Sequence, residues 1–184
     1  MTDRGAIARS KRLSWLLRHG AGERGLAMDT AGWAAIDDVL VATGLSRDEL
    51  DEAVRTNTKR RLQFDGERVR ACQGHSQRNT AVTREGLERS WQRWDGEASL
   101  WHGTALAALD GIAAHGILPI ARTHVHLADA PDATVGKRAH VDVLLEVDPR
   151  RLRARGLDVF VAPNAVVLVR EVPPDCIVAT RPTS

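Results

Sequence analysis

The stretch R-R-L-Q-F-D-G-E-R-V-R-A, residues 60–71, decides how the first half of this sequence folds. Asp65-Gly66 separates two runs in which apolar and polar residues alternate, and this pattern is a strong signal for a β-hairpin. The hairpin would follow three predicted helices. Three helices and a hairpin are the layout of a winged-helix module, and this layout alone says nothing about function.

The three helices are predicted from apolar periodicity and from capping signals. Apolar residues recur over residues 7–18, and the sequence G-A-G-E-R-G that follows should end this helix. A second helix is expected over residues 36–43. Ser46-Arg-Asp-Glu49 is a capping box, so a third helix should begin there and run to about Arg55.

The second half of the chain predicts a different architecture. A polar stretch without a strand pattern comes first, and short strand-like runs follow it, interrupted by one helix over residues 106–115. The runs are S-L-W-H-G-T, H-V-H-L, V-D-V-L-L-E-V, V-F-V-A and A-V-V-L-V. We therefore expect an α+β protein with a winged-helix lobe (1–80), a linker (81–97) and a mixed α/β lobe with a small twisted sheet (98–184).

Composition is typical of a globular protein that stays in the cytosol. The chain has 184 residues, of which 43% are hydrophobic, and no apolar run reaches the length of a membrane span. The N-terminus lacks the apolar core of a secretory signal, so we expect a cytoplasmic protein that does not enter a membrane. Nothing demands more than a monomer. Cys72 and Cys176 are expected to be buried, reduced thiols.

The sequence A-R-T-H-V-H-L, residues 121–127, places three cation-capable side chains on one face of a predicted strand. Strand residues alternate between faces, so Arg122, His124 and His126 would point the same way. His-x-His on a strand is a familiar metal-ligand pattern, but a guanidinium beside a divalent cation is electrostatically unfavourable. Arginine binds phosphate through a bidentate fork, and histidine can donate to it. We therefore favour phosphate or pyrophosphate over a metal.

Two basic clusters lie in the first half. Arg18 and His19 stand at a predicted helix end, where the helix macrodipole favours cations, so a structural explanation also accounts for them. K-R-R at residues 59–61 opens the hairpin and could track a phosphate backbone or keep an exposed edge strand from aggregating. If basic residues from both halves converge, they would form a site for a highly anionic substrate in a cleft between the lobes. The residues of this site would be Arg18, His19, Arg61 and Arg122.

Two short motifs combine a glycine with hydrogen-bonding neighbours. Q-G-H-S at residues 73–76 is most simply an ordinary loop. W-H-G-T at residues 101–104 ends a predicted strand, and its glycine would let a ligand approach the backbone closely. The sequence contains no recognisable carboxylate pair for hydrolysis, glycine-rich phosphate loop or Ser-His-Asp order.

Taken in order, these motifs resemble those of the RNA 2′-phosphotransferase family, Tpt1/KptA. The ordered set is S-K-R-L-S-W-L-L-R-H, D-T-A-G-W, K-R-R-L, R-V-R-A-C-Q-G-H-S, L-W-H-G-T, R-T-H-V-H-L, V-G-K-R and N-A-V-V-L. The resemblance runs from about Ser10 to Pro174. Each motif is weak by itself, whereas the whole set in this order is very specific.

The resemblance implies an N-terminal winged-helix lobe and a C-terminal ADP-ribosyltransferase-like lobe. It also implies a transferase that consumes NAD+ as a co-substrate and needs no metal. The 2′-phosphate of an RNA, such as one left by tRNA splicing, would attack C1″ of NAD+ and expel nicotinamide. The ribose 2″-hydroxyl would then attack the phosphate, which releases RNA with a free 2′-hydroxyl and ADP-ribose 1″,2″-cyclic phosphate.

The resemblance further implies which residues do this. The family's catalytic histidine and arginines map onto Arg18, His19, Arg61 and Arg122. The residues expected to bind NAD+ are His102, Gly103, Thr104, His124, His126, Gly136, Arg138, Asn164 and Val166. Those expected near the RNA phosphate are Gln73 and His75. Guanidinium groups suit the charge that builds on a phosphate, and a histidine suits acid–base work near neutral pH.

Three departures from the family pattern leave questions open. The family's K-Q-R-F is K-R-R-L here, so Arg60 rather than Arg61 could be the third catalytic basic residue. L-Y-H-G-T has become L-W-H-G-T, which exchanges one aromatic residue for another. N-G-V-W-L has become N-A-V-V-L, residues 164–168, and the loss of its glycine and tryptophan could reshape one wall of the NAD+ pocket.

Other functions fit part of the same sequence. A winged-helix protein without catalysis would bind RNA or DNA in a salt-dependent way and would not turn over NAD+. An ADP-ribosyltransferase that acts on terminal phosphates of RNA or DNA would share only the first chemical step. A His-x-His metalloprotein is a third alternative.

Overall fold

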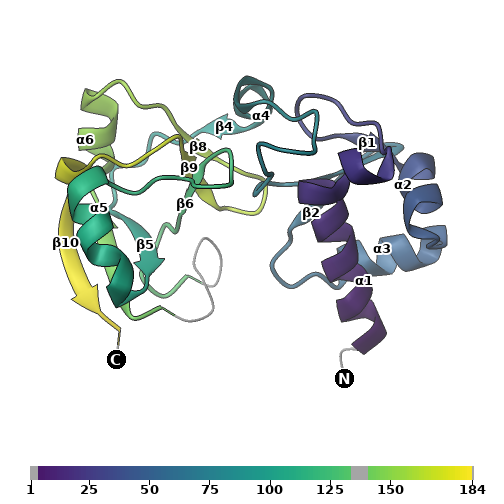
Figure 1. Ribbon diagram of the computed structural model, residues 1–184, viewed down its shortest axis with the longest axis horizontal. Helices are drawn as coiled ribbons and strands as arrows, with labels where there is room; N and C mark the ends of the chain where they lie inside the picture. Colours follow the sequence, from purple (N-terminus) through teal and green to yellow (C-terminus); the bar gives the residue numbers. More distant parts are fainter. Residues whose placement is uncertain (1–3, 134–140, 184) are drawn as a thin grey trace. The chain divides into compact units, whose positions relative to one another are not determined.

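The computed structural model of the chain describes residues 4–133 and 141–183. It divides into two compact units, Met1–Ser90 and Trp91–Ser184. Each unit combines helices with small antiparallel sheets, which confirms the expected mixture of α and β structure (Figure 1). Within the described ranges, no helix has both the length and the apolar composition needed to cross a bilayer.

The N-terminal unit contains the predicted helices. Its helical segments are α1 (Arg4–Trp15), the π-helical turn η1 (Leu16–Gly20), the 3-10 turn η2 (Gly22–Arg24), α2 (Ile36–Thr43), α3 (Arg47–Arg55) and α4 (Arg84–Ser90). The bounds of α2 match the prediction. The capping box before α3 is confirmed, because Ser46 Oγ accepts the N–H of Glu49 while the Glu49 carboxylate accepts the N–H of Ser46.

The predicted hairpin also forms and carries a third strand. The strands of this unit are β1 (Ala34–Ala35), β2 (Leu62–Asp65) and β3 (Arg68–Ala71), in the order β1-β3-β2. Asp65 pairs with Arg68, so the turn consists of Gly66 and Glu67, and Gly66 takes a φ of +58° that glycine adopts without strain. β1 was not predicted because two residues are too few to show an alternation of apolar and polar side chains.

A single apolar core joins the helices of this unit to its sheet. Side chains from α1, η1, α2, α3 and β3 are buried together, among them Leu13, Leu17, Ile36, Leu50 and Val69. Full burial of one such side chain contributes about 1.5–3 kcal/mol. This core packs η1 against β3, which brings the end of the first helix to the hairpin.

The C-terminal unit contains two antiparallel sheets, where we expected one. Their orders are β10-β7-β5 and β4-β8-β9-β6. The strands are β4 (Gln92–Arg93), β5 (Leu100–Thr104), β6 (Val125–Leu127), β7 (Val143–Val147), β8 (Val159–Val161), β9 (Val167–Val169) and β10 (Ile177–Pro182). Apolar side chains of both sheets share one core, and a bridge between Trp101 and Ala128 connects them.

The helical segments of this unit are η3 (Leu106–Ala108), α5 (Leu109–His115), α6 (Pro149–Ala154) and η4 (Pro174–Cys176). The helix predicted over residues 106–115 is present, although its first turn is 3-10. The helix α6 was not predicted although its sequence carries clear signals, since Asp148 caps the N–H of Arg150 at 2.8 Å and Pro149 takes the first helical position. The stretch that we interpreted as a linker contains α4 and β4.

Candidate functional site

The predicted site residues form two groups, one in each unit. The N-terminal unit contains Arg18, His19, Arg61, Gln73 and His75. The C-terminal unit contains His102, Gly103, Thr104, Arg122, His124, His126, Asn164 and Val166. Gly136 and Arg138 lie outside the described residues.

Arg18 and His19 lie in the π-helical turn η1 at the end of α1. The apolar residues of this turn are buried, whereas both cationic residues are half-buried. Gly20 closes the turn, and a Cβ at this position would lie 2.4 Å from the indole ring of Trp15. Turns of this kind are rare and occur often at functional sites.

The main chain of Arg18 is fastened to the Q-G-H-S segment. Its carbonyl oxygen accepts hydrogen bonds from the backbone N–H of Ser76 at 2.9 Å and from Ser76 Oγ at 3.3 Å. Gln73 and His75 are 6% and 0% exposed, and Gly74 between them has a φ of +86°. Gln73, Gly74 and His75 belong to no helix or strand, as expected of a loop, but the segment is packed into the unit rather than exposed.

Arg61 is held at the other end of the same segment. Its carbonyl oxygen accepts the backbone N–H of Cys72 at 2.8 Å, one step beyond the pairing of β2 with β3. Residues 72–76 thus run from the partner of Arg61 to the partner of Arg18. The hairpin register and one short segment fix the main chains of both arginines within this unit.

Arg60 and Arg61 differ in backbone conformation and exposure. Arg60 is exposed and has a φ of +46°, which is uncommon for a residue with a side chain, whereas Arg61 is half-buried. Buried Asn57 fixes this turn, because its carbonyl accepts the N–H of Arg60 at 2.8 Å and its Oδ1 accepts the N–H of Arg61 at 3.2 Å.

Cys72 sits among these cations without becoming a reactive thiol. Burial raises the pKa of Cys72 to about 11, although the charges of Arg70, Arg18 and Arg60 act in the opposite direction. Its Sγ donates to the carbonyl oxygen of Arg60 at 3.3 Å. A thiol with this pKa is almost fully protonated near neutral pH, so Cys72 has a structural role.

In the C-terminal unit, three predicted site residues are linked by hydrogen bonds. Arg122 Nη1 donates to Nδ1 of His126 at 3.1 Å, and a guanidinium only donates, so the proton of neutral His126 is on Nε2. The carbonyl oxygen of His126 accepts from Nδ1 of His102 at 3.1 Å, which places a proton on Nδ1 of His102. These hydrogen-bond partners therefore determine which ring nitrogen of His126 and of His102 carries the proton.

The strand that we predicted over residues 121–127 is shorter, because β6 begins at Val125. Thr123 and His124 are both buried, which an alternating strand with one exposed face would not give. The His124 ring packs edge-on against Trp91, with ring centroids 5.0 Å apart. The argument that strand alternation puts three cation-capable side chains on one face therefore does not extend to His124.

Gly103 and Thr104 are buried in β5, where Gly103 pairs with Leu144 of β7. A Cβ at Gly103 would lie 2.4 Å from Cγ1 of Val141. The glycine is thus needed for close packing against a neighbouring segment of the same unit. This contact explains the residue without a ligand.

Asn164 and Val166 are buried in the turn between β8 and β9. The N–H of Ala162 donates to the carbonyl of Val166 at 2.9 Å, and the N–H of Ala165 donates to the carbonyl of Ala162 at 2.9 Å. Ala165 has a φ of +63°, in the region that favours glycine. The alanine therefore keeps a turn conformation that a glycine would take without strain.

The segment D-T-A-G-W, residues 29–33, has no role predicted from the sequence, yet it lies beside the candidate site residues of the N-terminal unit. A Cβ added to Gly32 would lie 2.7 Å from Nε2 of His75. The segment's place in the ordered set of motifs was the signal that the sequence offered. Among the described residues, no group of three or more His, Cys, Asp or Glu side chains is arranged to hold a metal ion.

Comparison with known proteins gives consistent matches over most of the chain. The family model described as "RNA 2′-phosphotransferase, Tpt1 / KptA family" matches residues 4–171. A protein of Burkholderia lata named "Probable RNA 2′-phosphotransferase" is 42% identical over 175 residues, which cover 89% of this chain and 86% of that protein. Proteins with the same name from Pseudomonas syringae pv. tomato and Rhizobium johnstonii are 39% and 33% identical, over 89% of this chain and 89% of each relative.

Cys72 should react slowly with iodoacetamide in the folded protein. With a pKa of about 11, its thiolate fraction at pH 8 is roughly a hundredfold lower than that of an ordinary thiol. Peptide-resolved mass spectrometry should show slow labelling of the native protein, faster labelling in urea, and a native rate that rises as the pH approaches 11. Equal rates with and without urea at pH 8 would contradict the assignment.

Ala165→Gly should raise the free energy of unfolding by about 0.5–1 kcal/mol. The left-handed conformation costs an L-residue about 1–2 kcal/mol, and the greater freedom of glycine in the unfolded chain offsets part of the gain. Urea denaturation measures the difference. Ala113→Gly is the matched control, because Ala113 is exposed within the helix α5, where glycine costs about 0.5–1 kcal/mol relative to alanine, so this variant should lose stability instead. A loss of stability in Ala165→Gly would show that this turn carries no strain.

Proposed function

Since the chain belongs to the RNA 2′-phosphotransferase, Tpt1 / KptA family, we propose that it removes an internal 2′-phosphate from RNA by transferring it to ADP-ribose. The ADP-ribose would come from NAD+, so nicotinamide is released. The remaining products are RNA with a free 2′-hydroxyl and ADP-ribose 1″,2″-cyclic phosphate. This proposal goes beyond the family membership in naming the co-substrate and the products.

In this proposal the N-terminal unit is a winged-helix lobe that contacts RNA, and the C-terminal unit is an ADP-ribosyltransferase-like lobe. The order of α1, α2, α3 and the β2–β3 hairpin, with β1 added to β3, supports the first assignment. Two small antiparallel sheets over one shared core support the second. Both assignments agree with the chemistry of the residues that each unit contributes.

One observation carries the proposal: the N-terminal unit ties Arg18 and Arg61 to residues 72–76 by main-chain hydrogen bonds. Arg18 and Ser76 are 58 residues apart in sequence. The charges of Arg18 and Arg60 both act on the Cys72 thiol, so the cations gather around this segment. Cations whose main chains are fixed before a phosphate binds need less reorganisation during the reaction, and such groups stabilise the charge that develops on a transferring phosphate.

In the C-terminal unit, neutral His126 holds the guanidinium of Arg122 through Nδ1, which restricts how that guanidinium can turn. The half-buried imidazole of His102 is oriented by the His126 carbonyl, and in the neutral ring its Nε2 is an acceptor. Such donors and acceptors fit the pyrophosphate and ribose hydroxyls of NAD+. When bound, NAD+ supplies the electrophilic C1″ and the 2″-hydroxyl.

Gln73 supports a role near the RNA. It is 6% exposed, and its Oε1 has no hydrogen-bond partner among the described residues. A buried acceptor without a partner is costly, and a donor from a ligand would relieve that cost. A ribose hydroxyl of the RNA is such a donor.

The function is tested by incubating the protein with NAD+ and a short RNA that carries one internal 2′-phosphate. We expect dephosphorylated RNA, nicotinamide and ADP-ribose cyclic phosphate, identified by chromatography and mass spectrometry. Arg122→Ala should lower the rate by about 10²–10³-fold, the usual cost of removing one group that stabilises developing charge. Arg150→Ala is the matched control in the same unit, because Arg150 is exposed and paired with Glu97 at 2.6 Å. Absence of any NAD+-dependent change would overturn the proposal.

A second pair of variants separates Arg60 from Arg61. Arg60→Gly removes the side chain and also relieves the left-handed backbone, so it should keep stability and most of the activity. Arg61→Ala should lose activity by about 10²-fold or more, as expected for a group on the phosphate. The opposite pattern, with activity lost in Arg60→Gly and kept in Arg61→Ala, would reassign the third catalytic arginine to Arg60.

A further inference from the structure

We propose that residues 29–33 form a positioning loop and that Gly32 is its decisive residue. The loop holds the imidazole of His75 in place and, through Ser76, the main chain of Arg18. Gly32 is therefore a positioning residue for the reaction, and its role in turnover rests on the proposed function.

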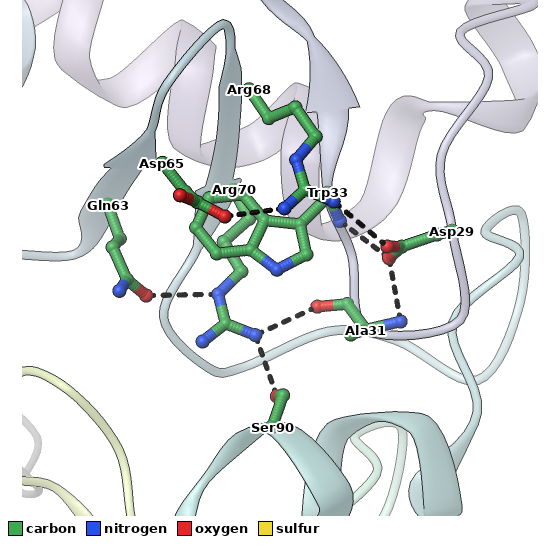
Figure 2. A network of polar contacts seen from close by, with 8 residues as sticks. All are labelled: Asp29, Ala31, Trp33, Gln63, Asp65, Arg68, Arg70 and Ser90. Atoms are coloured by element: carbon green, nitrogen blue, oxygen red, sulfur yellow. Dashed lines mark hydrogen bonds and ion pairs between the residues drawn. The ribbon is translucent and has the colours of Figure 1, made fainter.

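The loop is a tight turn that is tied to itself. Asp29 Oδ1 accepts the backbone N–H groups of Ala31 at 2.8 Å and Trp33 at 2.9 Å (Figure 2). The backbone N–H of Asp29 donates to the carbonyl of Trp33 at 2.9 Å, and that of Gly32 donates to the carbonyl of Asp29 at 3.0 Å. Gly32 has a φ of +84°. These bonds leave the loop little freedom to change shape.

Arg70 fastens one side of the loop to the hairpin and to α4. Its guanidinium donates to the carbonyl of Ala31 at 3.2 Å, to Ser90 Oγ at 2.7 Å and to Gln63 Oε1 at 3.0 Å (Figure 2). The Trp33 ring lies over the same guanidinium, with the ring centroid 4.4 Å from Cζ. Arg70 is 2% exposed, so these contacts are shielded from water and strong.

The segment around α4 also packs directly against the loop. The backbone N–H of Thr83 donates to the carbonyl of Thr30 at 3.1 Å. A Cβ at Gly86 would lie 2.2 Å from the same carbonyl oxygen, so the helix backbone is pressed directly against the loop. The loop cannot withdraw in this direction without breaking a hydrogen bond and displacing α4.

His75 is therefore the group that must yield when Gly32 gains a side chain. The new Cβ would lie 2.7 Å from Nε2 of His75, and His75 is 0% exposed. The residue after His75 holds the carbonyl oxygen of Arg18 by two hydrogen bonds. Close-packed interiors transmit such displacements, so a shift of His75 reaches the turn that carries Arg18 and His19.

The chain offers matched controls for the backbone effect. Gly25 and Gly44 have φ values of +62° and +68°, and no atom would lie within 4 Å of a Cβ at either position. Gly25→Ala and Gly44→Ala therefore add a similar backbone strain without pressing on a neighbour. Gly32→Ala should lower kcat by about 10–100-fold, because ångström-scale misplacement of reacting groups costs that much. The kcat of both control variants should stay within about twofold of that of the parent protein.

A double-variant cycle tests whether His75 carries the effect. In a His75→Ala background the added methyl group has room, so Gly32→Ala should lower kcat less than about threefold further. The imidazole resonances of His75, measured by NMR without any substrate, should shift in Gly32→Ala and stay unchanged in Gly25→Ala.

The positioning role would be overturned by equal activity in Gly32→Ala and Gly25→Ala, or by the same loss from Gly32→Ala in both backgrounds. An unchanged His75 spectrum in Gly32→Ala would overturn it independently of activity. A parent protein that is inactive on 2′-phosphorylated RNA would instead refute the proposed function. In that case, shifted imidazole resonances would still support the steric contact on which the positioning role depends.

Discussion

The buried guanidinium of Arg70 is the constraint on which the arrangement of the N-terminal unit depends. A charge that is 2% exposed costs several kcal/mol unless nearby acceptors compensate for the lost hydration. Here the acceptors are uncharged and come from β2, the 29–33 loop and the end of α4. Burial lowers the pKa of Arg70 from its ordinary value, which reflects the same cost. The hairpin, the loop and α4 must therefore fold together or leave that charge unsatisfied.

The two groups of candidate site residues are held by different means. In the N-terminal unit, hydrogen bonds to the main chains of Arg18 and Arg61 fix these residues, so their positions depend on backbone register. In the C-terminal unit, Arg122 is held by the ring of His126, whose protonation state decides whether it can accept. A substitution at His126 therefore releases the Arg122 side chain directly, whereas a substitution in the N-terminal unit acts on Arg18 and Arg61 through the main chain.

Local signals predicted α2, the Ser46 capping box and the β2–β3 hairpin, because each depends on residues that are close in sequence. Features that depend on residues distant in sequence were not predicted. They are the two-residue strand β1, the division of the C-terminal strands into two sheets, and the burial of His124 against Trp91. The order of short motifs predicted the family correctly, since it draws on the whole chain. It could not reveal that Gly32 touches His75, because nothing in either motif encodes their contact.

The π-helical turn η1 makes the length of the N-terminal helix as important as its composition. Each residue of an α-helix advances the chain by about 100° around the axis. Removing one residue between Ser10 and Arg18 would leave the composition of the helix almost unchanged and yet rotate α1 relative to Arg18, whose main chain is bound by Ser76. Homologous chains should therefore differ in this helix by substitutions and not by insertions or deletions.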